Sequence, residues 1–107
     1  MDEEIIISTS ENVNGKLPKK TFGIVRGNTV RARWFGRDIA ASFKNLVGGE
    51  IKSYTDLTTA ARDEAVARMV DEAKKKGANA VIMVRFSMGE IMPGAVEILA
   101  YGTAVLV

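Results

Sequence analysis

Four carboxylates could supply oxygen ligands to a metal ion. Asp38, Glu50, Asp56 and Glu64 lie on two predicted helices and the loop between them, and in a ring of subunits they could converge on a hard cation such as Ca²⁺ or Mg²⁺. Carboxylates in such positions more often cap helices or form surface ion pairs, and no D-x-D-x-D spacing accompanies them. We therefore favour a structural role and keep a carboxylate metal site as an alternative.

A basic, aromatic stretch, RARWFGR (31–37), could hold phosphates and stack bases through Arg31, Arg33, Arg37 and Trp34. Alternation at period two sends Arg31 and Arg33 to one face and Trp34 to the other, which is the ordinary pattern of a strand. Trp34 is then expected to pack at a core or at a subunit contact. Since the chain contains no recognisable nucleic-acid-binding motif, a nucleic acid is the less favoured partner.

Two glycines and two tyrosines complete the candidate ligand or interface residues. Gly48 and Gly49 could present backbone N–H groups to an anion, but no Lys-Ser/Thr follows them directly as in a Walker motif, so we favour a helix end and a turn. Tyr54 and Tyr101 could offer hydroxyl groups to a cleft between subunits. The alternative for each tyrosine is a half-buried ring that makes one hydrogen bond.

The absence of two residue types limits the chemistry further. The chain has no cysteine and no histidine, which excludes thiolate nucleophiles, Ser–His triads, histidine acid–base catalysis and Cys/His zinc sites. We therefore expect a protein that is not an enzyme and carries no cofactor, apart from a metal ion if the carboxylates bind one.

Length and composition indicate one globular domain over residues 1–107, with 47% hydrophobic and 26% charged residues. The net charge of +2 is too small to imply a polyanionic partner. No apolar run reaches the length of a membrane span, and the N-terminal MDEEIIIS is acidic, unlike a secretory signal. With no cysteine to form disulfides, these features predict a cytoplasmic protein.

The most regular element is an amphipathic helix over 56–76. Apolar residues recur at spacings of three and four, as Ala61, Ala65, Met69 and Ala73 illustrate, and Gly77 follows three lysines as the expected helix end. The other expected elements are a short strand over 4–9, a loop over 11–20, a strand from Thr21 that continues to Trp34, a short helix over 36–47, a strand over 80–86, a turn region over 88–95 and a strand over 96–107.

Gly27 and Asn28 interrupt the first long strand. They could form a two-residue hairpin turn or a bulge in one bent strand. We favour the bent strand, because the alternation of apolar residues resumes after them.

These elements predict a two-layer α+β domain, in which a three-stranded antiparallel sheet carries the long helix on one face. Two runs of four apolar residues, 81–84 and 104–107, are typical of strands that are covered on both faces. One helix covers one face, so we expect a second copy of the chain to cover the other and predict a homo-oligomer. The alternative is that the N-terminal strand and the first helix fold across the second face.

Several stretches of this sequence resemble the YbjQ-like family of small domains that are labelled as heavy-metal-binding. The matching stretches are GIVRG (23–27), RDIAASFKNLVGGEIKSYT (37–55), AARDEAVARMVDEAKKKGANAV (60–81) and AYGTAVLV (100–107). The resemblance implies a dodecin-subunit-like βαββ fold and a pentameric ring in which short strands bridge the subunits. The heavy-metal label would require soft Cys or His ligands, which this chain lacks.

Together, these observations favour a non-catalytic, ring-forming homo-oligomer, with five subunits by resemblance, that acts as a binding or scaffold module. A carboxylate metal-binding protein is the first alternative. A nucleic-acid binder acting through Arg31, Arg33 and Arg37 is the second.

Overall fold

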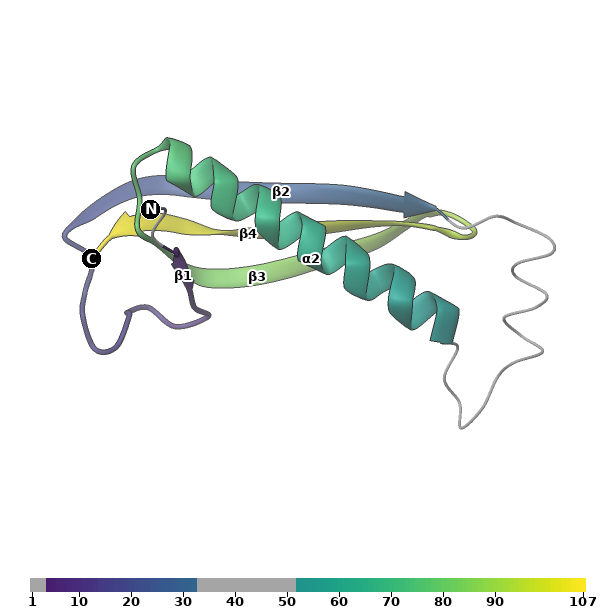
Figure 1. Ribbon diagram of the computed structural model, residues 1–107, viewed down its shortest axis with the longest axis horizontal. Coiled ribbons are helices and arrows are strands. Elements are labelled where there is room, and N and C mark those ends of the chain that lie inside the picture. The colour runs from purple at the N-terminus through teal and green to yellow at the C-terminus, as the bar shows by residue number, and fades with distance from the viewer. Residues whose placement is uncertain (1–3, 33–51) are drawn as a thin grey trace.

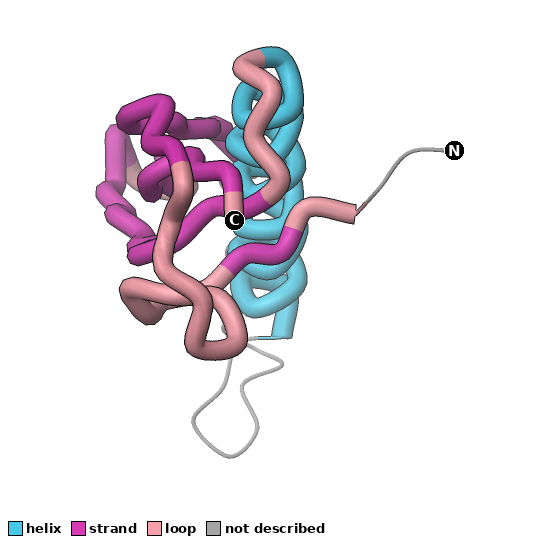
Figure 2. Tube along the Cα trace, turned by 90° about the vertical axis from the view of Figure 1, so that its left-hand side faces the viewer, coloured by secondary structure: helices cyan, strands magenta, loops and turns pink. Residues whose placement is uncertain are grey.

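The computed structural model describes residues 4–32 and 52–107, in which one long helix lies on a four-stranded sheet (Figure 1). Seen from the side, the helix and the strands form two layers (Figure 2). The elements are β1 (Ile6–Ile7), β2 (Lys20–Ala32), α2 (Lys52–Lys75), β3 (Ala80–Met92) and β4 (Ala95–Leu106), and the strand order in the sheet is β1-β3-β4-β2. The predicted α+β class is confirmed. The sheet has one strand more than expected, because the short strand predicted over 4–9 joins it as β1.

The additional strand is β1, which pairs in parallel with the start of β3 within the same chain. Ser8 continues this contact, because its N–H donates to Val81 O and its own carbonyl accepts from Val84 N–H, both at 2.9 Å. The short strand therefore satisfies main-chain groups of its own subunit, whereas the resemblance implied that short strands bridge subunits.

Helix α2 begins at Lys52, four residues before the predicted start at Asp56, and ends near the predicted position. Gly77 has φ 88°, and its N–H donates to Lys74 O while Ala78 N–H donates to Ala73 O. These two bonds form a Schellman motif, which satisfies carbonyl groups of the last helical turn. The expectation that Gly77 ends the helix is confirmed.

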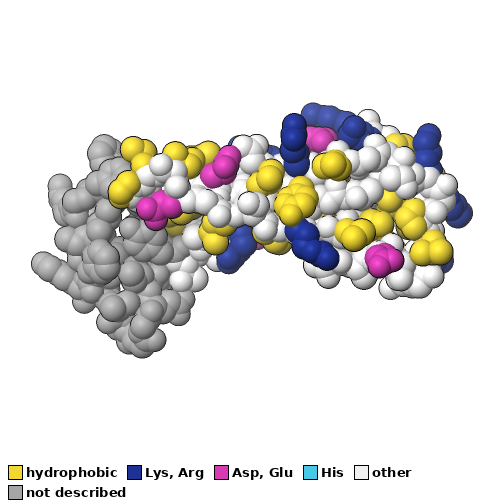
Figure 3. Space-filling view, turned by 180° about the vertical axis from the view of Figure 1, so that it is seen from behind, with side chains coloured by type: hydrophobic (Ala, Val, Ile, Leu, Met, Phe, Trp, Pro, Cys, Tyr) yellow, Lys and Arg dark blue, Asp and Glu magenta, His cyan; other side chains and the backbone are white. Residues whose placement is uncertain are grey.

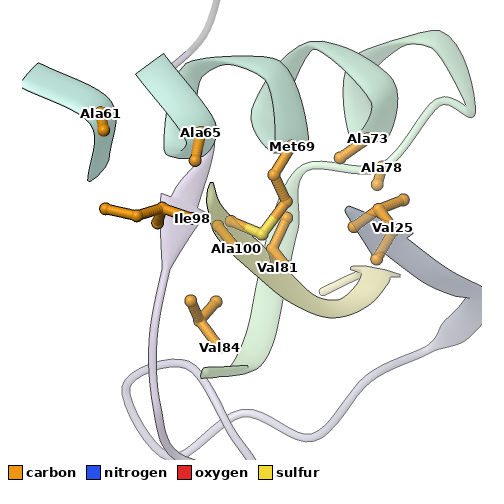
Figure 4. Packing of buried hydrophobic residues seen from close by; sticks show 11 residues of the cluster. Val25, Ala61, Ala65, Met69, Ala73, Ala78, Val81, Val84, Ile98 and Ala100 are labelled. Atoms are coloured by element: carbon orange, nitrogen blue, oxygen red, sulfur yellow. The ribbon is translucent and has the colours of Figure 1, made fainter. Parts of the chain in front are cut away.

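The main core lies between α2 and the sheet (Figure 4). Ala61, Ala65, Met69 and Ala73 are fully buried, and the Met69 side chain reaches down between the strands towards Ala100. Because three of these four residues are alanines, the helix backbone can approach the sheet closely. The closest approach is at Gly27 of β2, where an added Cβ would lie 2.2 Å from the carbonyl oxygen of Ala65.

Strand β2 runs without interruption through Gly27 and Asn28, which pair with Ala100 and Leu99 of β4. The hairpin interpretation of these residues is therefore excluded, and the predicted bulge is in the wrong place. The register of β2 shifts earlier, between Thr21 and Gly23. A side chain at position 27 would collide with α2, which passes over this residue. This packing requirement cannot be recognised from the alternation of apolar residues along the strand.

The β3–β4 hairpin is longer than predicted. Strand β3 continues to Met92 where the sequence predicted an end at Phe86, and β4 starts at Ala95. The turn is reduced to Pro93 and Gly94, with Gly94 at φ 83°. Pairing with β4 carries the strand past Gly89, because cross-strand hydrogen bonds compensate for the weak strand preference of glycine.

The second face of the sheet is covered at one end by the chain itself. Val13 packs against Ala80, Ile82 and Val105, and all four side chains are buried. Val13 is held there by a tight turn at Asn14 and Gly15, both with positive φ, and by paired hydrogen bonds with Lys16. The apolar runs on β3 and β4 thus find cover at this end from the loop before β2, where we had expected a second subunit.

The predicted helix over 36–47 and the predicted end of the first strand at Trp34 lie outside the described residues. Among the residues that are described, no helix has the length and apolar character required to cross a membrane.

Candidate functional site

Three side chains that could contact a ligand form one row across the face of the sheet that α2 does not cover. Arg26 of β2 and Arg85 of β3 are both direct cross-strand partners of Tyr101 on β4. Residues in such pairs have Cβ atoms about 5 Å apart, so an arginine side chain starts from the sheet on each side of Tyr101. Figure 3, which views the molecule from the side opposite to α2, shows basic side chains on both sides of apolar ones near the middle of this face.

A β-bulge places Arg85 in this row. The register of β3 shifts between Ile82 and Arg85, so that two residues, Met83 and Val84, stand opposite Gly102 of β4. Met83 adopts φ 54°, a left-handed conformation that is strained for a side chain of this kind. If the register of Ile82 and Thr103 continued without a shift, Val84 would pair with Tyr101, so the bulge determines which side chain completes the row.

Beside Arg85 lies an open hollow of about 470 Å³, lined by Thr9, Ser10, Glu11, Asn12, Met83 and Arg85. Arg85 Nη1 donates to the carbonyl oxygens of Thr9 at 3.0 Å and Val84 at 2.9 Å, which orients the guanidinium group. The wall of the hollow is held by short local bonds, among them Ser8 Oγ to Ser10 Oγ at 2.6 Å. A polar hollow next to an oriented guanidinium group suits an anionic or strongly polar ligand.

The carboxylates predicted as metal ligands do not converge within the described part of the chain. Glu64 accepts bonds from both Arg31 and Arg68, and Asp56 is exposed on α2. Asp56 lies eight residues before Glu64, or about 12 Å along the helix axis. Asp38 and Glu50 are outside the described residues. Within 4–32 and 52–107 no three Asp, Glu, Cys or His side chains are grouped to hold a metal ion.

Among the residues predicted to contact a nucleic acid in the stretch 31–37, Arg31 is the one that the structure describes. Arg31 lies on the face that α2 covers and forms an ion pair with Glu64, so its positive charge is balanced within the subunit. Arg33, Trp34 and Arg37 are outside the described residues, as are Gly48, Gly49 and the side chain of Tyr54; these assignments remain predictions. Tyr101 is described, and it stands 38% exposed at the middle of the open face.

Sequence reasoning missed Arg26 and Arg85. The alternation of exposed and buried residues around Arg26 could have assigned it to the face opposite Val25 and Gly27. No sequence signal could have placed Arg85 beside Tyr101, because the bulge at Met83 reverses the alternation between Ile82 and Arg85.

Comparison with known proteins gives consistent matches over nearly the whole chain. The family model YbjQ_1, described as "Putative heavy-metal-binding", matches residues 5–107. A "UPF0145 protein" of Thermosipho africanus is 55% identical over 101 residues, 94% of both chains. One of Archaeoglobus fulgidus is 54% identical over 105 residues, which cover 98% of this chain and 97% of that protein.

A similar solved structure is that of a protein of unknown function from Pediococcus pentosaceus, assigned to the DUF74 family. It superimposes with a TM-score of 0.66 at 17% identity and covers 96% of this chain and 97% of that chain. At this identity the likeness supports the fold alone.

Proposed function

We propose that this chain, which belongs to the YbjQ family, functions as a non-catalytic homo-oligomeric binding or scaffold module whose copies associate through the part of the β3–β4 hairpin beyond Val84. The family resemblance drawn from the sequence is confirmed over residues 5–107. The observation that carries the proposal is the apolar surface of β3 beyond Val84.

Four large apolar side chains of β3 are half exposed or more: Phe86 at 50%, Met88 at 59%, Ile91 at 56% and Met92 at 53%. They follow directly on the buried part of the same strand, where Val81 and Val84 belong to the core. An isolated apolar side chain on a surface needs no explanation, but four within seven residues of one strand are typical of an interface.

The edges of the sheet favour a head-to-tail contact between copies. Beyond Val84, β3 has no strand on its outer side among the described residues, and β2 has β4 as its one strand neighbour there. Unpaired strand edges attract other strands. Because the two edges belong to different strands, a contact between them is heterologous and closes into a ring when the rotation allows. Five copies is the number that the family resemblance implied.

Light scattering on the purified chain tests this proposal. A pentamer has five times the 11.6 kDa mass of one chain. The double variant Phe86→Asp/Met88→Asp is expected to give monomers, because two carboxylates in an apolar contact are costly to desolvate. Leu17→Asp, at a residue that is 71% exposed in the loop before β2, is the matched control and should leave the mass unchanged. A monomer of the unsubstituted chain at micromolar concentration would refute the proposal.

Metal binding through carboxylates is a second candidate, favoured by the description of the family model. With no Cys or His in the chain, the ligands would be oxygen atoms, contributed by different copies in a ring. Titration calorimetry of tag-free protein with Ca²⁺, Mg²⁺, Mn²⁺, Zn²⁺ and Cu²⁺ tests this. Saturable heat that is lost in Asp56→Asn supports a site at that carboxylate, and no heat with any of the five ions rules the candidate out.

A further inference from the structure

We propose that the row of Arg26, Tyr101 and Arg85 on the open face of the sheet binds single-stranded nucleic acid. One base stacks on the ring of Tyr101, and the phosphates on its two sides contact the two guanidinium groups. This site differs from the stretch 31–37 and does not depend on the oligomer proposed above.

The charges of the two arginines are available to a ligand. The side chain of Arg26 has no hydrogen bond or ion pair within the described part of the chain, and Arg85 uses one side-chain nitrogen, Nη1, on two carbonyl oxygens. Nη2 and Nε of Arg85 thus remain free for an anion. Glu97 on β4 and Glu11 in the hollow form no ion pair with either arginine.

The surroundings of Tyr101 suit a flat aromatic ligand. Ala100 and Gly102, its neighbours on β4, are buried on the side of α2, so the ring stands on the opposite side. The adjacent cross-strand pairs on the open face are Ile24 with Thr103 and Asn28 with Leu99. Along the strands the ring thus has the apolar side chains of Ile24 and Leu99 among its neighbours, and across them it has one arginine on each side.

The spacing of the two arginines favours a strand of nucleotides over a single phosphate. Their Cα atoms are two strand spacings apart, about 10 Å, with Tyr101 between them. One phosphate cannot contact both side chains without covering the ring, whereas a nucleotide within a strand has a phosphate on each side of its base. Aromatic rings on a sheet combined with basic side chains are a general means of binding single strands without sequence preference.

Fluorescence anisotropy with a labelled oligothymidylate of about 12 nucleotides tests the proposal on the full chain. Arg26→Gln/Arg85→Gln should weaken binding about tenfold or more at about 50 mM salt and reduce the slope of log K against log salt by about 1.4. Tyr101→Ala should weaken binding about 5- to 150-fold without changing that slope, and Tyr101→Phe should keep the affinity. Arg62→Gln/Arg68→Gln removes the same two charges from the exposed surface of α2 and should have no effect; Arg62→Gln removes one and should have none either.

The comparison of ligands separates stacking from charge. The proposal requires the oligonucleotide to bind more tightly than an abasic strand of equal length, inorganic polyphosphate or a mononucleotide. Equal binding of the abasic strand or polyphosphate, a mononucleotide that binds as tightly, equal loss in Arg62→Gln/Arg68→Gln, or no binding of the unsubstituted chain would each overturn it. Far-ultraviolet circular dichroism and the melting temperature establish that each variant is folded. If Tyr101→Ala does not fold, photocrosslinking of a thiouridine strand replaces it, and Tyr101 must carry the crosslink.

Discussion

The two halves of the β3–β4 hairpin belong to the same strands but have different surroundings. Between Ala80 and Val84, β3 is buried except at Met83, because α2 covers one face and the Val13 turn covers the other. From Arg85 to Met92 every residue of β3 is exposed. We call these two parts the covered half and the outer half of the hairpin.

We infer from this difference that the covered half stabilises the fold and that the outer half provides a contact surface. Buried apolar area provides the main driving force for folding, so the covered half and α2 should account for the free energy of unfolding. The outer half exposes apolar side chains that contribute little to the monomer and remain available for association. Two pairs of substitutions test this division and two more test polar contacts of the covered part, from the largest expected effect to the smallest.

Replacing a methionine by alanine should lower the stability strongly in the core and weakly in the outer half. Met69→Ala removes a fully buried side chain from the centre of the core and should lower the free energy of unfolding by about 2–5 kcal/mol. Met88→Ala, at 59% exposure, should lower it by less than about 0.5 kcal/mol. Urea denaturation of both variants in a Phe86→Asp background measures this, provided that light scattering shows the background to be monomeric, and similar losses would contradict the division.

Replacing a glycine by alanine should likewise destabilise the protein where α2 covers the sheet and have little effect in the outer half. Gly27→Ala places a Cβ against the backbone of α2 and should cost about 1–3 kcal/mol or more, since neither backbone can move aside easily. Gly89→Ala, in the outer half of β3, meets no atom within 4 Å and should be neutral or slightly stabilising. Thermal denaturation followed by circular dichroism compares the two variants, and an unchanged melting temperature of Gly27→Ala would disprove the close approach of α2.

Asn79 joins the loop after α2 to the end of β4. Its side chain donates to Val107 O at 3.0 Å and accepts from Val107 N–H at 2.9 Å. Asn79→Ala should therefore cost about 1–3 kcal/mol, the usual contribution of two hydrogen bonds. Asn28→Ala is the control, because its exposed side chain makes no such bonds. Chemical denaturation measures both, and an equal effect would show that the bonds of Asn79 contribute nothing specific.

The smallest effect is expected at the ion pairs of Glu64. Glu64→Gln keeps the shape of the side chain and removes the charge that pairs with Arg31 and Arg68, which should cost at most about 1 kcal/mol because all three side chains are partly exposed. Asp71→Asn, whose one ion pair with Lys75 is largely exposed, should cost less. Denaturation at low and high salt checks this: the loss in Glu64→Gln should shrink as salt screens the charges.

Much of the architecture followed from local patterns. The apolar spacing of Ala61, Ala65 and Met69 correctly predicted the buried face of α2, and Gly77 correctly predicted its end. The errors concern where pairing continues: the sequence around Gly89 suggested a turn, yet β4 holds β3 in the sheet as far as Met92. Strand length depends on a partner that is distant in sequence, so local preference alone underestimates it.

The candidate site was predicted only in part, since Tyr101 was identified and its two neighbours were not. The sequence by itself determined the helix, the Pro93-Gly94 turn and the absence of cysteine and histidine, because these depend on residue type and short-range spacing. The tertiary structure decided which side chains share a face. An extra residue at Met83 shifts the register of β3 and brings Arg85 beside Tyr101, and the Val13 turn covers a surface that we had assigned to a second subunit. The register of a strand and the segment that covers a sheet face both depend on long-range packing. The alternation of residues along one strand does not reveal either.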